Sequence, residues 1–255
     1  RWNHEVDLHG KRVAIIGSAA SAIQIVPELA KQAAHVTVLQ RTPNWIMARG
    51  RKFYSKTLIA LFNCLPGLVN VYRRIQAYMM SFTVEGVTLG HKRMDQFEKI
   101  AKDYLHEVIK DPELRETLTP NSRYGCKRGL VSDDFYPALL RDNVDLVAEG
   151  LKAVRPQGIT TASDQLIDVD VIIYCTGYHI LDYDRIDVIG LAGKSLANEM
   201  SQSPTAYMGI AATDFPNYFF AAGPNGLAIN ASYFANVERN TKTIVGLLTQ
   251  KQQAG

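Results

Sequence analysis

The sequence predicts an α/β protein in which a parallel sheet, built from strand–helix–strand units, is interrupted by a helical insertion. A short apolar run at residues 11–17 ends in glycine, and residues 19–34 then carry apolar side chains at helical spacing. Residues 36–39 form a second run rich in β-branched residues. Such a βαβ unit has a right-handed crossover and parallel strands. Since 47% of the 255 residues are hydrophobic, the chain can bury a sizeable core.

The later elements follow from composition and spacing. Residues 54–110 have helical spacing and few strand signals, whereas residues 111–129 mix Pro, Asn, Ser and Gly and predict a loop. Together they predict a helical insertion at about residues 54–118. Further strands are predicted at residues 144–147, 151–154, 169–175 and 217–222. A final helix is predicted at residues 231–248.

Charge and cysteine usage narrow the class of partner. There are 28 Lys and Arg against 25 Asp and Glu, without long runs of like charge, so the expected partner is a small molecule and not a nucleic acid. The three cysteines have no C-x-x-C spacing and the six histidines no metal-ligand spacing, so no disulfide framework or metal site is expected. A reducing, cytoplasmic location fits this usage. The apolar residues 58–72 are too short to span a membrane and predict a buried or surface-docking helix pair.

The turn after the first strand is a candidate pyrophosphate site. It reads Gly-Ser-Ala-Ala-Ser-Ala where a dinucleotide-binding fold places G-x-G-x-x-G/A. Gly17 suits the tight turn, and Ala22 permits close packing of helix on strand. Ala19 replaces the middle glycine, so its methyl group narrows the approach to a phosphate. The first N–H groups of the helix would bind the pyrophosphate. The candidate residues are Gly17, Ser18, Ala19, Ala20, Ser21 and Ala22.

The end of the second strand indicates which dinucleotide is bound. NAD-binding folds place an acidic residue there for the ribose 2′-hydroxyl, whereas an arginine there can bind the 2′-phosphate of NADP. This chain has Gln40 and Arg41 at that point and no acid. A guanidinium pairs with phosphate through charge-assisted hydrogen bonds, so NADPH is predicted over NADH. The alternative is a solvated arginine at a strand end.

These motifs resemble those of one family, the Baeyer–Villiger monooxygenases, which are relatives of the flavin-containing monooxygenases. The resemblance lies in residues 10–17, GKRVAIIG, and 40–45, QRTPNW. The family fingerprint F-x-G-x-x-x-H-x-x-x-W ends shortly before such a strand, and Trp2 stands where its tryptophan belongs. Asn3 departs from the usual Pro or Asp. The earlier fingerprint residues would precede Arg1, so we expect an N-terminal FAD-binding part to be missing.

A second landmark is residues 124–128, YGCKR, which are similar to the family's run of glycine, lysine and arginine. The resemblance implies that Lys127 joins Arg41 and Thr42 around the 2′-phosphate. It also implies that Arg128 is the active-site arginine. In this family FAD is reduced by NADPH and reacts with O₂, and the reaction passes through anions that a fixed cation stabilises. The alternative is a solvated Lys–Arg pair on a loop.

Two later segments also resemble the family. Residues 171–178, VIIYCTGY, look like the strand that ends in A-T-G and links the two nucleotide domains, with Cys175 in place of alanine. The resemblance implies that Thr176 and Gly177 contribute to cofactor binding at a hinge. Residues 215–225 look like the return of the chain to the FAD domain. The cofactor-binding residues implied there are Gly223, Pro224 and Asn225.

The resemblance implies a Rossmann-like NADP-binding domain over residues 1–175 and the C-terminal part of an FAD-binding domain over residues 176–255. The implied activity transfers one oxygen atom from O₂ into a ketone, or onto a nitrogen or sulfur atom. Two alternatives remain open. One is a non-catalytic NADPH-binding module, and the other is a flavin-dependent reductase, although the absence of C-x-x-C counts against a disulfide reductase.

Overall fold

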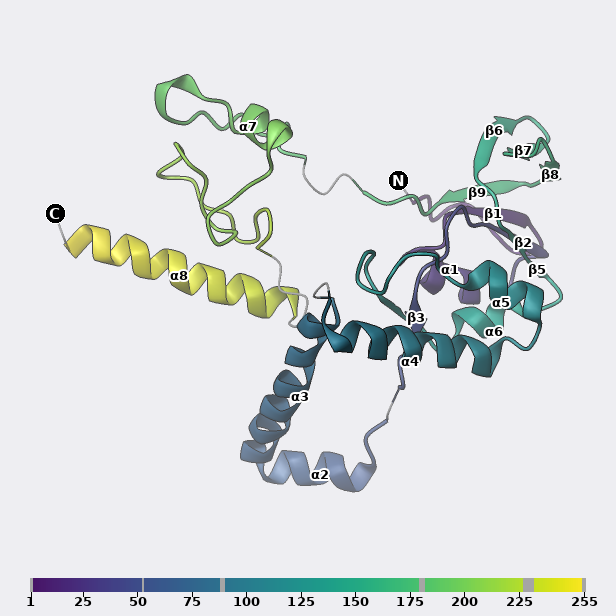
Figure 1. Cartoon of the computed structure of the whole chain (residues 1–255), viewed down its shortest axis with the longest axis horizontal. Helices are drawn as coiled ribbons and strands as arrows, with labels where there is room; N and C mark the ends of the chain where they lie inside the picture. Colours follow the sequence, from purple (N-terminus) through teal and green to yellow (C-terminus); the bar gives the residue numbers. More distant parts are fainter. Residues whose placement is uncertain (1, 52, 88–89, 179–181, 227–231, 254–255) are drawn as a thin grey trace. The chain divides into compact units, whose positions relative to one another are not determined.

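The computed structural model (Figure 1) describes most of the chain, namely residues 2–51, 53–87, 90–178, 182–226 and 232–253. The chain divides into two compact units. Unit 1 comprises Arg1–Leu61 and Glu85–Gly177, and unit 2 comprises Phe62–Val84 and Tyr178–Gly255. The assignment of these parts to an NADP-binding and an FAD-binding domain stays a prediction.

Unit 1 is organised by a four-stranded sheet in the order β5-β2-β1-β9. Its strands are β1 (Arg12–Ile16), β2 (His35–Leu39), β5 (Val144–Val147) and β9 (Val171–Tyr174). All three pairings are parallel, and helix α1 (Ala22–Leu29) connects β1 to β2. Strands β1 and β9 are nearly continuous apolar runs, RVAII and VIIY, as is typical of parallel strands that are covered on both faces. The α/β class predicted from the sequence is confirmed.

The two faces of this sheet pack against different layers. Val13 and Ile15 of β1 point into a core that includes α1, α4 (Lys92–Val108) and the short helix α6 (Phe135–Leu139). Ala14 and Ile16 pack with Leu39 and Ile159 on the opposite face. That face is covered by a three-stranded antiparallel sheet of β6 (Leu151–Arg155), β7 (Gly158–Thr161) and β8 (Leu166–Asp168). Figure 1 shows α1 and α6 on one side of the parallel sheet and β6–β8 on the other.

The helical insertion leaves and rejoins unit 1 at a pair of short parallel strands, β3 (Ile46–Met47) and β4 (Leu130–Val131). Its helices are α2 (Lys56–Cys64), α3 (Pro66–Gly86), α4 (Lys92–Val108) and α5 (Pro112–Leu118). The loop predicted for residues 111–129 is therefore wrong at its start. Asp111 caps α5 by accepting a hydrogen bond from the Glu113 N–H, and Pro112 occupies the first helical turn, where it is tolerated.

Helix α2 and most of α3 remain exposed. None of the residues of α2, all of which are described, is buried. Of the two alternatives predicted for residues 58–72, a buried or a surface-docking helix pair, burial therefore does not apply to this helix. Within the described ranges, no helix is both long and apolar enough to cross a membrane.

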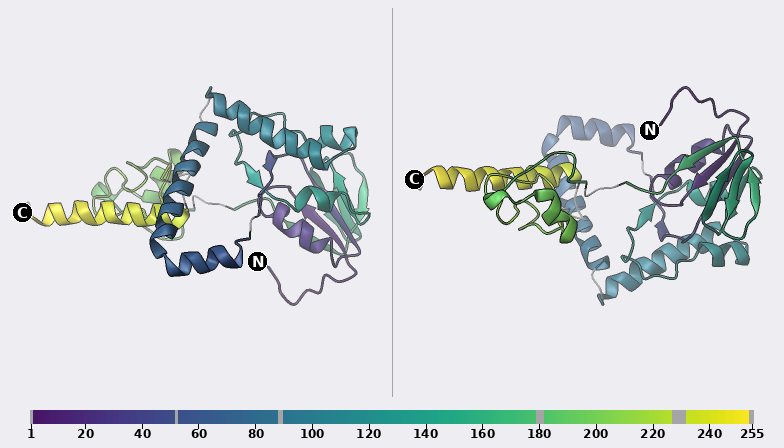
Figure 2. Two further views of the ribbon diagram at one scale, coloured as in Figure 1. Left: turned by 90° about the horizontal axis from the view of Figure 1, so that it is seen from below. Right: turned by 90° about the horizontal axis from the view of Figure 1, so that it is seen from above.

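Unit 2 contains helix α7 (Leu196–Gln202), helix α8 (Tyr233–Gln253) and a 3₁₀ turn, η1 (Leu191–Gly193). A small core gathers Leu196, Met200, Phe215 and Phe220. The strand predicted at residues 217–222 is wrong, because these described residues form only an isolated bridge between Phe219 and Ala211. The apolar side chains of this run serve the core instead. The α8 helix is continuous in both views of Figure 2 and extends beyond the predicted residue 248.

Candidate nucleotide-binding site

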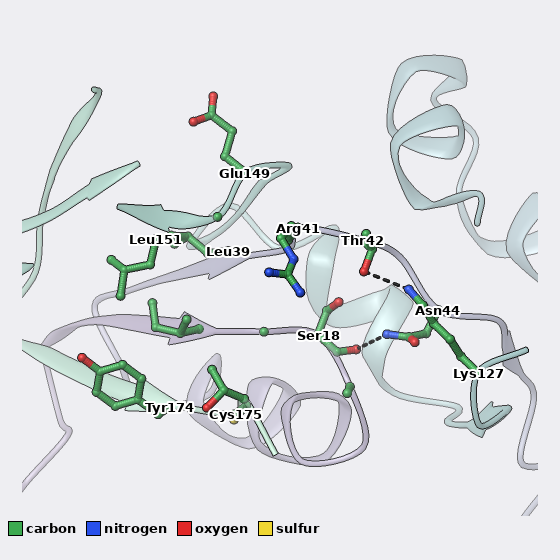
Figure 3. A pocket seen from close by; sticks show the side chains of 15 residues that line it. Ser18, Leu39, Arg41, Thr42, Asn44, Lys127, Glu149, Leu151, Tyr174 and Cys175 are labelled. Carbon is green, nitrogen blue, oxygen red and sulfur yellow. Dashed lines mark hydrogen bonds between the residues drawn. The ribbon is translucent and has the colours of Figure 1, made fainter. Parts of the chain in front are cut away.

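A cleft of about 620 Å³ opens in unit 1 at the carboxyl ends of β1, β2 and β9 (Figure 3). Ile16 and Gly17 line it from β1, Leu39 and Arg41 from β2, and Tyr174 from β9. Strand β1 has β2 on one side and β9 on the other, so the chain leaves β1 between two diverging connections. Open α/β sheets bind ligands at such a switch point.

Gly17 forms the turn at the end of β1. Its φ is +103°, a conformation that side chains other than hydrogen rarely adopt, and a Cβ there would lie 2.8 Å from the Cys175 carbonyl oxygen. The Gly17 N–H donates to the Leu39 carbonyl at 2.9 Å, and the Cys175 N–H donates to the Ile16 carbonyl at 2.9 Å. The chain therefore turns between the ends of both neighbouring strands, where only glycine fits.

The residues after Gly17 lead into α1. Ser18 and Ala19 line the cleft, whereas Ala20 and Ser21 follow in the turn and Ala22 is fully buried at the start of the helix. The Ile23 N–H donates to the Ala19 carbonyl at 3.1 Å. The backbone N–H groups at the start of a helix have no carbonyl acceptor within that helix. Those between Gly17 and Ile23 are therefore suited to bind an anion.

Two cations and a hydroxyl group meet at the end of β2. Lys127 Nζ donates to Thr42 Oγ1 at 2.9 Å, and Arg41, Thr42 and Lys127 all line the cleft. Figure 3 shows the Arg41 side chain extending into the cleft toward Ser18. A guanidinium and an ammonium group bind phosphate through charge-assisted hydrogen bonds, so this group of side chains is suited to a phosphate.

The loop that carries Lys127 is held in place from two sides. The Trp45 indole N–H donates to the Ser122 carbonyl at 2.7 Å, and the Leu130 N–H donates to the Trp45 carbonyl at 2.9 Å. Arg123 forms ion pairs with Glu98 and Asp95 of α4. These contacts fix the loop to β3 and α4 and hold Lys127 beside the turn after β2.

The lining residues that the sequence reasoning missed include Asn44, Tyr174 and Glu149. Asn44 Nδ2 donates to the Ser18 carbonyl at 3.4 Å and thereby links the two turns. Tyr174 lines the cleft from the end of β9. Glu149 also lines it, but in Figure 3 its carboxylate points away from Arg41. It accepts from the Ser163 N–H, and hydrogen bonds from Ser163 and Thr161 lower its pKa. Tyr174 lies near the carboxyl end of the predicted strand 169–175, and Glu149 follows the predicted strand 144–147. Their place at the ends of strands is the signal that could have found them.

Thr176 is a further predicted residue that lines the cleft, and Gly177 follows it with a φ of +101°. The remaining predicted site residues lie elsewhere. Arg128 is exposed on the Lys127 loop and is outside the set of described residues that line the cleft. The residues Gly223, Pro224 and Asn225 belong to unit 2. There the Gly223 N–H donates to the Gly209 carbonyl at 2.9 Å, and a Cβ on Gly223 would lie 2.8 Å from that oxygen.

Comparison with known proteins identifies the family. A family model described as flavin-binding monooxygenase-like matches residues 2–189. The chain belongs to this family. The resemblance inferred from the motifs is thereby confirmed. A Baeyer-Villiger monooxygenase of Streptomyces coelicolor is 37% identical over 256 residues, which cover 100% of this chain and 49% of that protein. One of Pseudomonas aeruginosa is 39% identical over 236 residues, covering 92% and 45%.

A solved structure shows the same arrangement. A crystal structure of OTEMO in complex with FAD and NADP matches with a TM-score of 0.81 and 25% identity. The match covers 98% of this chain and 54% of that one. The chain thus spans about half the length of the curated and solved relatives that it matches.

Proposed function

We propose that this chain forms the NADPH-binding half of an FAD- and NADPH-dependent monooxygenase that inserts one oxygen atom from O₂ into a ketone. The observation that carries the proposal is the grouping of Arg41, Thr42 and Lys127 beside the Gly17 turn. The names of the relatives support the reaction class, since several are Baeyer-Villiger monooxygenases. Oxygenation of a nitrogen or sulfur atom is the related activity within the same proposal.

The cleft fits the pyrophosphate and the 2′-phosphate of NADPH, of which the 2′-phosphate distinguishes NADPH from NADH. We assign the pyrophosphate to the turn of Gly17, Ser18 and Ala19, which line the cleft just before helix α1. The N–H groups at the start of a helix bind anions, and Gly17 allows the tight turn that leads to them. We assign the 2′-phosphate to Arg41, Thr42 and Lys127. The Glu149 carboxylate stays ionised, since hydrogen bonds from Ser163 and Thr161 lower its pKa, but it points away from Arg41 (Figure 3). The role of these residues is to bind the nucleotide and orient its nicotinamide end.

The flavin is assigned in part to unit 2. In the turn of Gly223, Pro224 and Asn225, a Cβ on Gly223 would collide with the Gly209 carbonyl and the Phe220 ring, so glycine here permits close packing within unit 2. The assignment of the flavin to this turn is supported by the family resemblance of residues 215–225. Because the chain spans about half of its relatives, we propose that the rest of the flavin site comes from a part those relatives carry beyond the matched half. When bound, FAD would supply the activation of O₂ after reduction by NADPH.

Arg128 is assigned to the reacting centre, next to the residue that binds the 2′-phosphate. The loop that carries Arg128 is held by the Trp45 hydrogen bond and by the ion pairs of Arg123, so the backbone of Arg128 is fixed near the cleft. The oxygenation of a carbonyl passes through anions, and a preorganised cation stabilises them. We propose that Arg128 fills this role, with a ketone as substrate.

The nucleotide assignment is tested with Arg41→Ala in the full chain, by calorimetric titration with NADP⁺ and with NAD⁺. Losing charge-assisted bonds to the 2′-phosphate should weaken NADP⁺ binding by about ten- to a hundredfold, because such bonds contribute roughly 1.5–3 kcal/mol. NAD⁺, which has no 2′-phosphate, should bind with nearly unchanged affinity. Arg155→Ala, an exposed arginine at the end of β6, is the matched control and should leave both affinities unchanged.

Equal losses for NADP⁺ and NAD⁺ would remove Arg41 from the 2′-phosphate site. The oxygenation is tested separately, in the FAD-loaded enzyme, by measuring ester formed from a ketone against NADPH consumed. Nucleotide selectivity without any oxygenated product would leave a NADPH-binding module and contradict the monooxygenase proposal.

A further inference from the structure

Asn44 lies between the two groups of residues that line the cleft from the ends of β1 and β2. Its side-chain amide donates from Nδ2 to the Ser18 carbonyl oxygen at 3.4 Å, and Figure 3 shows this hydrogen bond near the one from Lys127 to Thr42. All four residues line the cleft. The proposed function assigns Ser18 to the pyrophosphate and both Thr42 and Lys127 to the 2′-phosphate, but it gives Asn44 no role.

The backbone of Asn44 is held on both sides. Pro43 precedes it, and the pyrrolidine ring of a proline fixes the φ angle of that residue. Trp45 follows it and is buried. The Trp45 indole N–H donates to the Ser122 carbonyl, and the Trp45 carbonyl accepts from the Leu130 N–H. The Asn44 side chain is therefore kept at the cleft by contacts that its neighbours in the sequence make.

The hydrogen bond from Asn44 sets the orientation of one peptide group in the turn after β1. The Ser18 carbonyl and the Ala19 N–H belong to the same peptide group, which is trans. In a planar trans peptide group the C=O and N–H bonds point in opposite directions. Because Asn44 binds the carbonyl, the Ala19 N–H is directed to the other side of the turn. A rotated peptide group would instead turn its carbonyl oxygen, which carries partial negative charge, toward an anion bound there.

The Ala19 N–H has no acceptor among the residues that the structure describes. Ala19 is exposed and lines the cleft. In contrast, the Gly17 N–H donates to the Leu39 carbonyl, and the Ile23 N–H donates to the Ala19 carbonyl. An N–H group without an acceptor at the start of a helix is suited to bind an anion.

We propose that Asn44 is a positioning residue for the pyrophosphate of the dinucleotide. By holding the Ser18 carbonyl, it presents the Ala19 N–H to the pyrophosphate and keeps the carbonyl oxygen away from it. This inference rests on the proposed nucleotide site and deepens it. NADP⁺ and NAD⁺ share the pyrophosphate, so Asn44 contributes to the affinity for both and not to the choice between them.

The test is Asn44→Ala in the full chain, by calorimetric titration with NADP⁺ and with NAD⁺. Loss of one neutral hydrogen bond should weaken the binding of both by about two- to tenfold, and by the same factor. Adenosine 2′-monophosphate carries the 2′-phosphate but no pyrophosphate. Its affinity, measured by competition with NADP⁺, should not change in this variant. Arg41→Ala should give the reverse pattern, with weaker binding of adenosine 2′-monophosphate and nearly unchanged binding of NAD⁺.

Asn143 supplies a matched control. Its side-chain amide also donates to backbone carbonyls of unit 1, those of Ala30 and Ala33, at 3.1 and 3.2 Å. These carbonyls follow the end of α1, whereas the Ser18 turn precedes its start. Asn143→Ala removes the same kind of hydrogen bond outside the cleft, so it should leave all three affinities unchanged even where it lowers the melting temperature. Circular dichroism checks that both asparagine variants are folded.

Three outcomes would overturn the proposal. The first is unchanged binding of NADP⁺ and NAD⁺ to Asn44→Ala. The second is an equal loss for adenosine 2′-monophosphate, which would mean that Asn44 does not act through the pyrophosphate. The third is an equal effect of Asn143→Ala, which would reduce the role of Asn44 to the stability of unit 1.

The same titrations separate this inference from the proposed function. If the unaltered chain binds neither dinucleotide, the proposed nucleotide site is wrong and the role of Asn44 fails with it. If the unaltered chain binds both and only Asn44→Ala behaves otherwise than expected, the nucleotide site stands and the role of Asn44 alone is wrong. A FAD-loaded enzyme that binds NADPH but oxygenates no ketone contradicts the proposed reaction and leaves the role of Asn44 in binding intact.

Discussion

The two units differ in how much of their apolar surface they bury for themselves. Unit 1 encloses both faces of its sheet and fully buries large side chains such as Ile15, Leu105 and Phe135. Unit 2 has a small core around Phe215 and Phe220, whereas Asn236 is the buried residue of α8. Burial of apolar surface is the dominant favourable contribution to folding. The comparison teaches that the candidate cleft belongs to a unit that buries its own apolar surface, whereas large apolar side chains of α8, such as Phe234 and Val245, are exposed.

The largest test of this difference compares two phenylalanines. Phe135→Ala removes a side chain that is 1% exposed in unit 1 and should lower the free energy of unfolding by about 3–5 kcal/mol. Phe234→Ala changes a side chain that is 79% exposed on α8 and should change it by no more than about 0.5 kcal/mol. Urea denaturation followed by circular dichroism measures both. A similar cost for Phe234 would mean that α8 buries this face in solution, and the contrast between the units would fail.

A second test sharpens the description of the cleft within unit 1. Gly10 and Gly17 both have positive φ, +65° and +103°, but no described atom lies within 4 Å of a Cβ on Gly10. Gly10→Ala should therefore cost about 1 kcal/mol from the backbone alone. Gly17→Ala should cost about 3 kcal/mol, since its methyl group also collides with the Cys175 carbonyl. Equal costs in chemical denaturation would show that this turn is looser than described.

The smallest expected effect concerns the edge of the parallel sheet. Asp170 accepts hydrogen bonds from the side chain and the backbone N–H of Arg12, and these lower its pKa to about 2. Because the folded pKa is depressed below the ordinary value of about 3.9, the contribution to stability is present above that pH. It is lost as the pH falls through about 2. Asp170→Asn should flatten this acid dependence of the melting temperature, and an unchanged slope would contradict the assignment.

Much of unit 1 could be predicted from the sequence because its signals are local. The first strand, Gly17 and the second strand lie within thirty residues of one another, and their order alone predicts a cleft beside Arg41. Lys127 could not be placed by pattern, since it reaches Thr42 through a long insertion. Its place came from a family resemblance, and the structure brings the two side chains to 2.9 Å.

The elements that were missed have ambiguous local signals. Pro112 reads as a helix breaker, but after the cap residue Asp111 it begins α5. The apolar residues 217–222 look like a strand, but they lack a strand partner in the described part of unit 2 and pack in a loop core. The roles of Arg128 and of the Gly223 turn stay predictions, because no contact in either unit tests them.

The short pair of β3 and β4 has a consequence for how the insertion can vary. Ile46 pairs with Leu130 and Met47 with Val131, so the insertion departs and returns at one point of unit 1. The entropic cost of closing a longer loop grows slowly, by about 0.6 kcal/mol for each doubling of length. The exposed helices α2 and α3 should therefore tolerate changes of length and sequence. Helix α4 should not, because its Asp95 and Glu98 pair with Arg123 of the Lys127 loop and its Leu105 is buried in the core of unit 1.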